Sequence, residues 1–144
     1  MPHSYRSEVP CDPTVDAGIL DFFETFYRIS DTPGHHDAYV ANFTDDATFI
    51  LASKMGPFPE ILATRQAMWA QVASRKHAPT KIFPFGGDSR EFMLYGTVEF
   101  VFKDGRHGEL PWAARAVMDN STGKWLMSFY QVYLDTGGGV YDKR

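Results

Sequence analysis

Glu99 is a carboxylate in a stretch of sequence that otherwise looks buried. The run Glu91–Lys103 is dense in residues that favour β-strands, and valine and phenylalanine flank Glu99 in it. Burying a carboxylate among such side chains is costly unless it is paired or protonated, and functional pockets hold groups of this kind. The sequence predicts that Glu99 is a general acid or base in an apolar cavity. The alternative is a structural hydrogen bond to Tyr95, Tyr130 or a hydroxyl of a neighbouring strand.

His77 and two tyrosines could complete such a site. An imidazole within reach of Glu99 would form an acid/base pair that works near neutral pH. Tyr95 and Tyr130 could donate hydrogen bonds to a developing oxyanion. Each has a structural alternative, because Arg75-Lys76-His77 also fits a solvated turn and aromatic residues in strands usually belong to the core.

The sequence does not favour metal, phosphate or nucleic-acid chemistry. His35 and His36 are neighbours on a predicted helix and so point about 100° apart, and no second cluster has ligand spacing. Gly137-Gly138-Gly139 precedes no helix and is not a phosphate loop. The net charge is −4 without a long basic cluster, which argues against nucleic-acid and membrane partners. We expect no metal or other cofactor, and a soluble cytoplasmic protein because no signal or membrane pattern is present.

The first half of the chain predicts three helices. Residues 1–11 are expected to form a flexible N-terminal arm. Asp12-Pro13 has the chemistry of a helix start, and a second helix is predicted over residues 35–43. A third helix is predicted to begin at Pro59 and to end before Pro79. The apolar residues at helical spacing in the first helix are Ile19, Phe22, Phe23 and Phe26, and those of the third are Ile61, Leu62, Met68, Trp69 and Val72.

The second half predicts an antiparallel sheet. Asp104-Gly105-Arg106 and Asn120-Ser121-Thr122-Gly123 are turn sequences of the kind that joins antiparallel strands, while residues 54–59 read as a loop. Helices followed by an antiparallel meander indicate an α+β fold. The predicted strands are Ala47–Ser53, Thr80–Phe85, Glu91–Lys103, Glu109–Asp119 and Lys124–Asp135.

The strand Glu91–Lys103 is apolar on both faces, which predicts a dimer. Side chains alternate across a strand, and neither its odd-numbered nor its even-numbered residues can be left to water cheaply. One layer of helices covers only one face, so the other face is expected to meet a second copy of the chain. The predicted interface residues are Phe100, Phe102, Arg115, Phe129, Gln131 and Tyr133.

The order of these elements resembles the SnoaL-like proteins of the nuclear transport factor 2-like superfamily. The matching features are two N-terminal helices, Asp45-Asp46-Ala47-Thr48 entering the first strand, a Pro/Gly loop before the third helix, and the ending Tyr133-Leu134-Asp135. The stretch Trp112-Ala113-Ala114-Arg115 is most similar to small uncharacterised fungal members. The resemblance implies one domain over residues 12–136, followed by a flexible tail over 137–144. It also implies a cone-shaped fold, in which three N-terminal helices pack on a curved, mostly antiparallel sheet around a deep pocket.

The resemblance does not supply a complete catalytic set. Limonene epoxide hydrolase has an arginine and two aspartates where this chain is matched at Thr97, Glu99 and Val132. Ketosteroid isomerase has an aspartate where this chain has Leu51. Scytalone dehydratase uses two histidines, of which His77 lies near one place and Thr97 occupies the other. The resemblance makes Arg115 outward and implies that the inward residues are Phe49, Leu51, Tyr95, Thr97, Glu99, Trp112, Ala114, Ser128, Tyr130 and Val132.

We therefore expect a closed, largely apolar cavity that binds a hydrophobic small molecule. Aromatic residues make up 15% of the chain, which suits an aromatic-lined cavity. The expected function is a cofactor-independent isomerase, cyclase or dehydratase acting on a polycyclic compound, for example in natural-product biosynthesis. A non-catalytic binding or scaffold protein and an epoxide hydrolase are the alternatives. The cavity walls, besides the residues named above, are expected to include Phe23, Phe26 and Trp69.

Overall fold

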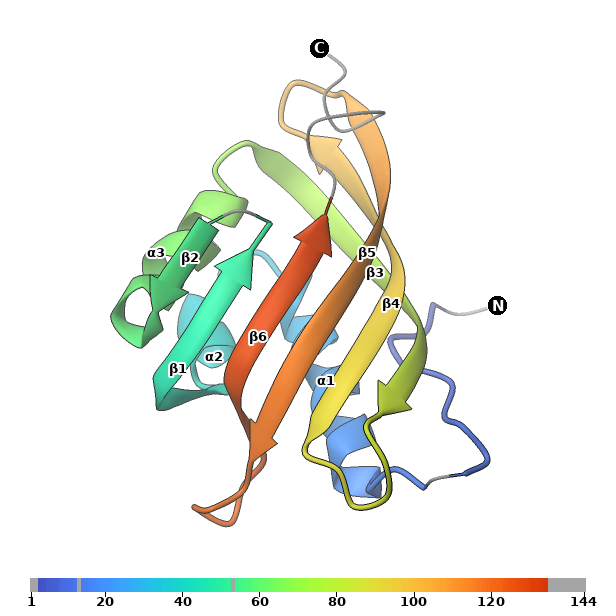
Figure 1. Ribbon diagram of the computed structural model, residues 1–144. Helices are drawn as coiled ribbons and strands as arrows, with labels where there is room; N and C mark the ends of the chain where they lie inside the picture. Colours follow the sequence, from blue (N-terminus) through green and yellow to red (C-terminus); the bar gives the residue numbers. More distant parts are fainter. Residues whose placement is uncertain (1–2, 13, 53, 135–144) are drawn as a thin grey trace.

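A six-stranded sheet forms one layer of the structure, and three helices lie against one of its faces (Figure 1). The computed structural model describes residues 3–12, 14–52 and 54–134, with the backbone alone for residues 54–59. The strand order is β2-β1-β6-β5-β4-β3, and neighbours are antiparallel except for the parallel pair β1 and β6. The predicted α+β architecture is confirmed. The strands are β1 Phe43–Leu51, β2 Lys54–Pro57, β3 Val72–Pro84, β4 Glu91–Phe102, β5 His107–Asp119 and β6 Leu126–Leu134.

The three helices are shorter than the sequence suggested. Helix α1 spans Ala17–Ser30 and begins after Asp16, whose carboxylate accepts the Gly18 N–H, so the start predicted at residues 12–13 is wrong. Helices α2 and α3 span His36–Val40 and Phe58–Met68. The segment predicted as a loop over 54–59 instead contributes the edge strand β2 and the first turn of α3. The buried face of α1 consists of Ile19, Phe23, Phe26, Tyr27 and Ser30.

Strand β3 begins eight residues earlier than predicted. The sequence predicts a start near Thr80 because proline ends helices. Strand β3 instead begins at Val72 and continues past Pro79 to Pro84. Proline is tolerated inside a sheet at irregularities, and the β3–β4 register shifts between Pro79 and Lys81. Gly96 lies opposite, where a Cβ would meet the backbone of Ala78 and Pro79. Arg75-Lys76-His77 therefore lies inside a strand rather than in a solvated turn.

The face of β4 that meets the helices is the opposite of the one predicted. Phe92, Leu94, Val98, Phe100 and Phe102 are all buried on the helix side. A strand can turn either of its two faces to the helices, and a shift of one residue exchanges the two faces. Burial of five large apolar groups stabilises the observed face more than burial of the other set would. The residues predicted inward that lie exposed on the outer face are Tyr95, Thr97 and Glu99.

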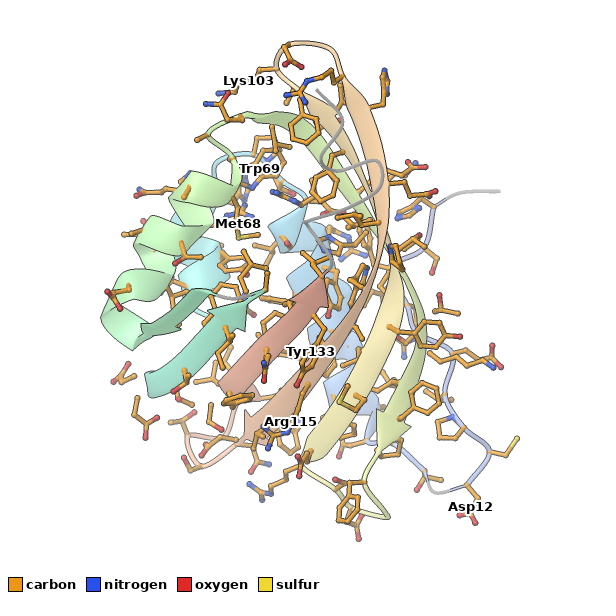
Figure 2. The ribbon with its side chains drawn as sticks, turned by 45° about the horizontal axis from the view of Figure 1, so that its top comes forward. Asp12, Met68, Trp69, Lys103, Arg115 and Tyr133 are labelled. Atoms are coloured by element: carbon orange, nitrogen blue, oxygen red, sulfur yellow. The ribbon has the colours of Figure 1, made fainter. Side chains whose placement is uncertain are left out.

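The remaining strands have the predicted orientation. Trp112, Ala114, Tyr130 and Val132 are buried on the inner face. Arg115 lies on the outer face, where its Nε atom donates to Glu91 over 2.7 Å. Figure 2 shows Arg115 and Tyr133 on this outer side of the sheet.

The N-terminal segment lies along the free edge of β3. Glu8 pairs with Lys81 in a parallel bridge, its N–H donates to the Thr80 carbonyl, and its carbonyl accepts from Ile82. The described part of the predicted arm is thus docked on the sheet. The predicted tail over 137–144 lies outside the described residues. Within those residues, no helix is long and apolar enough to cross a membrane.

Candidate functional site

A cavity of about 440 Å³ lies between the helices and the inner face of the sheet. This volume falls within the range of about 300–1,000 Å³ typical of small-molecule sites. Its walls come mainly from β1, β3, β4, β5 and β6, with α1, α2 and α3 contributing the other side. The predicted residues that line it are Phe26, Phe49, Leu51, His77, Trp112, Tyr130 and Val132. A cavity is therefore present between the helices and the sheet, with part of the predicted lining.

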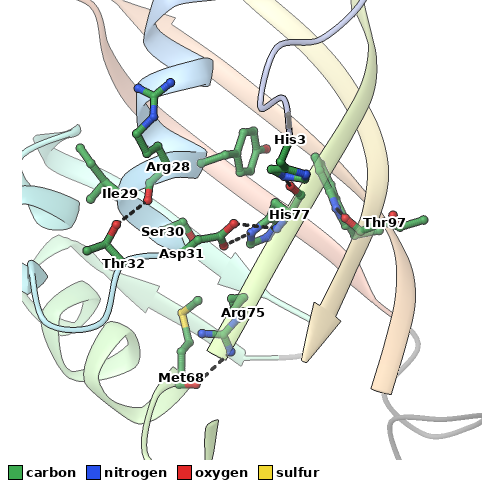
Figure 3. Close-up of polar contacts among 12 residues, drawn as sticks. His3, Arg28, Ile29, Ser30, Asp31, Thr32, Met68, Arg75, His77 and Thr97 are labelled. Carbon is green, nitrogen blue, oxygen red and sulfur yellow. Dashed lines mark hydrogen bonds and ion pairs between the residues drawn. The ribbon is translucent and has the colours of Figure 1, made fainter. Parts of the chain in front are cut away.

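His77 and Asp31 form a hydrogen-bonded pair at the wall of this cavity (Figure 3). The Nδ1 atom of His77 lies 2.6 Å from Oδ1 of Asp31, and the His77 backbone N–H donates to Oδ2 over 2.6 Å. The side chains are only 14% and 4% exposed. An ionised carboxylate only accepts hydrogen bonds, so Nδ1 is the donor to it, and in a neutral imidazole the lone pair is then on Nε2. This is the arrangement that a general base requires.

Helix α1 and the arm together hold Asp31. Asp31 is the residue that ends α1, and its N–H donates to the Tyr27 carbonyl over 3.1 Å. Burial, the charge of Asp31 and a hydrogen bond to it raise the pKa of Tyr5 to about 12, so the phenol stays protonated and donates to the carboxylate. His3 of the same arm contacts the His77 carbonyl through Nε2 at 2.5 Å (Figure 3). The arm thus contacts both residues of the His77–Asp31 pair.

Aromatic rings fix the imidazole plane of His77. The Tyr27 and Trp112 ring centroids lie 5.1 and 5.6 Å from that of His77. Trp112 is held in turn by its indole N–H, which donates to the Thr97 carbonyl over 2.9 Å. An imidazole packed in this way loses little rotational freedom when a ligand binds.

A pair of buried phenols lies beside the His77–Asp31 pair. The Tyr27 and Tyr130 hydroxyl oxygens are 2.8 Å apart, and burial raises the pKa of both phenols. Each hydroxyl has one proton, so one donates to the other and the pair keeps one further O–H to offer. Tyr130 lines the cavity, and its predicted role as a hydrogen-bond donor to a ligand stays a prediction.

Several predicted site residues lie away from the cavity. Glu99, Tyr95 and Thr97 are on the outer face, and Glu99 is paired in register with Lys76 and Glu109 there. The prediction that Glu99 faces the cavity is wrong, because β4 turns its larger apolar set inward. Three further residues predicted to line the cavity do not do so: Phe23 packs on Phe92, Trp69 packs on two arginines, and Ser128 donates to the Val117 carbonyl.

Two charged residues of the site, Asp31 and Arg75, were not predicted from the sequence. Asp31 lies in Asp31-Thr32-Pro33-Gly34, a sequence typical of a helix stop, which gives no reason to expect a site residue. Arg75 lines the cavity two residues before His77 on the same face of β3. No local signal marks Asp31, because its partner is 46 residues away. Arg75 could have been found by extending β3 through Pro79. Among the described residues, no three histidine, cysteine or acidic side chains lie so that they could hold a metal ion.

Solved structures with the same arrangement of elements include an enzyme and a transport factor. No protein-family model and no curated protein matches the sequence. A candidate aromatic ring hydroxylase from Novosphingobium aromaticivorans has a TM-score of 0.71 at 20% identity, over 82% of this chain and 87% of that one. The hexachlorocyclohexane dehydrochlorinase LinA type 2 has a TM-score of 0.70 at 14% identity, over 83% and 84%.

A third similar structure is that of a nuclear transport factor. Nuclear transport factor 2 from Cryptosporidium parvum has a TM-score of 0.66 at 12% identity, over 89% of this chain and all of that one. An enzyme and a transport factor thus share this architecture. The chain has the nuclear transport factor 2-like fold.

Proposed function

We propose that this protein is an enzyme that moves protons on a hydrophobic, ring-containing small molecule without a cofactor. The observation that carries the proposal is the His77–Asp31 pair at the wall of an apolar cavity. An imidazole exchanges protons near neutral pH, and a carboxylate on its far nitrogen stabilises the imidazolium that forms. The reaction class is isomerisation, cyclisation or dehydration.

Each step can be assigned to atoms of the site. Nε2 of His77 takes a proton from a carbon of the substrate, and the C–H electron pair is delocalised into an adjacent unsaturated group. Asp31 holds the ring and offsets its new positive charge. The imidazolium then returns the proton to another carbon, which completes an isomerisation, or it protonates a hydroxyl group that leaves as water, which completes a dehydration. In this proposal the remaining O–H of the Tyr27–Tyr130 pair stabilises negative charge on the substrate.

Exchange of carbon-bound hydrogen for deuterium tests this proposal without a known substrate. We expect the protein in D₂O to label two- and three-ring ketones such as 2-tetralone faster than free imidazole at the same concentration, as followed by NMR. Binding of each ketone is checked separately by quenching of tryptophan fluorescence. Ketones that bind but exchange no faster than with imidazole would contradict the enzyme and favour a non-catalytic ligand carrier of the same fold.

We also propose a homodimer through the outer face of the sheet. Two rows of side chains cross this face in register, Tyr95–Ala113–Tyr133 and Met93–Arg115–Gln131. Met93, Tyr95 and Tyr133 are each at least 39% exposed, which is unusual for large apolar groups that cluster. Phe100 and Phe102, predicted in this interface, line the cavity instead.

A charge at the centre of this patch is expected to separate the subunits. Ala113→Glu would place a carboxylate between Tyr95 and Tyr133, whereas Ala63→Glu alters an exposed position of α3 and serves as the matched control. Light scattering at micromolar concentration should report a dimer for the wild type and the control, and a monomer for Ala113→Glu. A monomeric wild type would end the proposal.

A further inference from the structure

The N-terminal arm joins the two elements that carry the His77–Asp31 pair. His77 lies on β3, whereas Asp31 ends α1, so the pair forms only where this helix packs against this strand. Arg6 fixes the arm on α1, because its Nη1 atom lies 2.9 Å from Asp21 and 2.6 Å from Glu24. The backbone hydrogen bonds described above fix the next part of the arm on the edge of β3. The arm therefore holds both elements at the place where the pair is made.

The first described residues of the arm touch both members of the pair. Nε2 of His3 lies 2.5 Å from the His77 carbonyl, and because a carbonyl only accepts, this nitrogen is the donor (Figure 3). The Tyr5 hydroxyl donates to the Asp31 carboxylate. The ring of Tyr5 is itself held, with its centroid 4.7 Å from that of His3 and 5.9 Å from Cζ of Arg28. The contact of Tyr5 with the carboxylate is thus built into the packing of the arm.

Tyr5 supplies the third hydrogen bond to a carboxylate that water hardly reaches. Asp31 already accepts from Nδ1 and from the backbone N–H of His77, each over 2.6 Å, and its side chain is 4% exposed. A hydrogen bond donated to the ionised form of a carboxyl group favours that form. Without the Tyr5 hydroxyl, the carboxylate would attract the proton on Nδ1 more strongly. Because the two groups titrate together, the imidazolium of His77 would then be favoured too.

We propose that Tyr5 is a positioning residue of the site, whose hydroxyl keeps Asp31 ionised and directed at Nδ1 of His77, so that the imidazole is free to accept a proton. The inference rests on the function proposed above and adds the arm to its machinery. Tyr5 lies outside the cavity lining that the structure describes, so it acts through Asp31 and does not touch the substrate. The other titratable groups around the pair include His3 of the arm, Tyr27 and Arg28 of α1, and Arg65 of α3.

Tyr5→Phe tests this role because phenylalanine keeps the ring and its packing and loses only the hydroxyl. NMR of the imidazole nitrogens follows the titration of His77, whose signals are identified by their absence in His77→Gln. We expect the midpoint of this titration to rise by at least about half a pH unit in Tyr5→Phe. Loss of a hydrogen bond to a charged group corresponds to about one to two units at the carboxylate, and part of this reaches the imidazole.

The rate of deuterium exchange into a bound ketone gives a second readout. In Tyr5→Phe, the acidic limb of the pH–rate profile should move to higher pH by the same amount as the NMR midpoint. The deficit in rate should therefore be largest at low pH and should shrink as the pH rises. A general loosening of the structure would instead lower the rate equally at every pH.

Two further variants separate the hydroxyl from the rest of the arm. Tyr95→Phe removes the same group from an exposed ring that stacks on Phe83 at the outer face, and it should keep the wild-type midpoint. His3→Ala removes the contact with the His77 carbonyl but leaves the Tyr5 hydroxyl in place, so its midpoint should change less than that of Tyr5→Phe. Circular dichroism verifies that each variant is folded.

An unchanged or lowered midpoint in Tyr5→Phe would overturn the inference, and so would an equal rise in Tyr95→Phe. The NMR titration needs no turnover, so it separates this inference from the proposed function. Ketone labelling together with an unchanged midpoint would keep the enzyme and reject the role of Tyr5. A raised midpoint in a protein that labels no ketone would support the control of the pair by Tyr5 and reject the enzyme.

Discussion

Replacing His77 with glutamine is expected to lower the rate of proton transfer at least about a hundredfold, the low end of general acid–base contributions. Glutamine fills a similar space and can still donate to Asp31, but it has no basic nitrogen. The cavity is built largely from other residues, so its affinity for a neutral dye such as Nile red should stay within about twofold, well below the tenfold that 1.4 kcal/mol represents. The measurement is deuterium exchange into a bound ketone.

Asp31→Asn should lose activity by a different route. The amide keeps the shape of the carboxylate, but its NH₂ group can donate to Nδ1 of His77 and thereby place the imidazole proton on Nε2. That nitrogen is then blocked as a base, and the imidazolium loses its counter-charge. We expect Asp31→Asn to lower the rate of proton transfer about a hundredfold or more. Its effect on ligand affinity should be smaller.

A distant histidine provides the control for both variants. His107 is exposed at the start of β5, and His107→Gln should exchange deuterium at the wild-type rate. Equal rates in the wild type and His77→Gln would remove the histidine from the mechanism. An active Asp31→Asn with an inactive His77→Gln would keep the base but reject the role of the carboxylate in setting its tautomer.

Strands β4, β5 and β6 could be predicted from the sequence because their signals are local. The turns at 104–106 and 120–123 contain Gly105 and Gly123, whose φ angles of 91° and 87° are costly for other residues. Apolar periodicity located the strands that these turns join. The face of β4 could not be predicted in the same way, since both of its faces are apolar and the choice depends on what packs against each.

The site was harder to predict than the fold because it is made by contacts between distant segments. His77 was recognised as a candidate, but its expected partner was Glu99 on the neighbouring strand. The carboxylate that it meets comes instead from the end of α1, and packing of α1 on the sheet makes that contact. Helix-terminal aspartates are common capping and turn residues, so Asp31 had no distinguishing feature in the sequence.

Arg65 holds the segment that contains Asp31, and its loss is expected to have the largest effect on stability. The side chain is fully buried on α3. Its Nη1 donates to the Ser30 carbonyl over 2.6 Å, and its Nη2 donates to the carbonyls of Ile29, Thr32 and Gly34 over 3.2, 2.7 and 3.0 Å. These four acceptors follow one another through the end of α1 and the loop after it, on both sides of Asp31.

The surroundings of Arg65 explain why its charge is tolerated. Nε donates to Nδ1 of His36 over 3.1 Å, and Cζ lies 4.7 Å from the Tyr39 ring centroid. Burial lowers the pKa of the guanidinium, but carbonyl dipoles and the ring face compensate for lost water. The planar fork of donors matches several carbonyls at once, which a lysine ammonium cannot do.

Arg65→Met should therefore reduce the free energy of unfolding in urea by about 3–5 kcal/mol. The apolar chain fills the space, yet it leaves buried carbonyls without donors, at about 1–3 kcal/mol for each that finds no water. Arg65→Lys should be intermediate. The matched control is Arg28→Met, which removes an exposed arginine whose pair with Glu24 contributes less than about 1 kcal/mol.

The same variants connect stability to the site. If Arg65 positions Asp31, then Arg65→Lys, assayed at a temperature where it is fully folded, should exchange deuterium more slowly while binding Nile red normally. A wild-type rate of exchange in Arg65→Lys would show that α1 and Tyr5 alone hold the Asp31 carboxylate against His77. An Arg65→Met protein as stable as the wild type would contradict the role of Arg65 altogether, since the four carbonyls would then have found other donors.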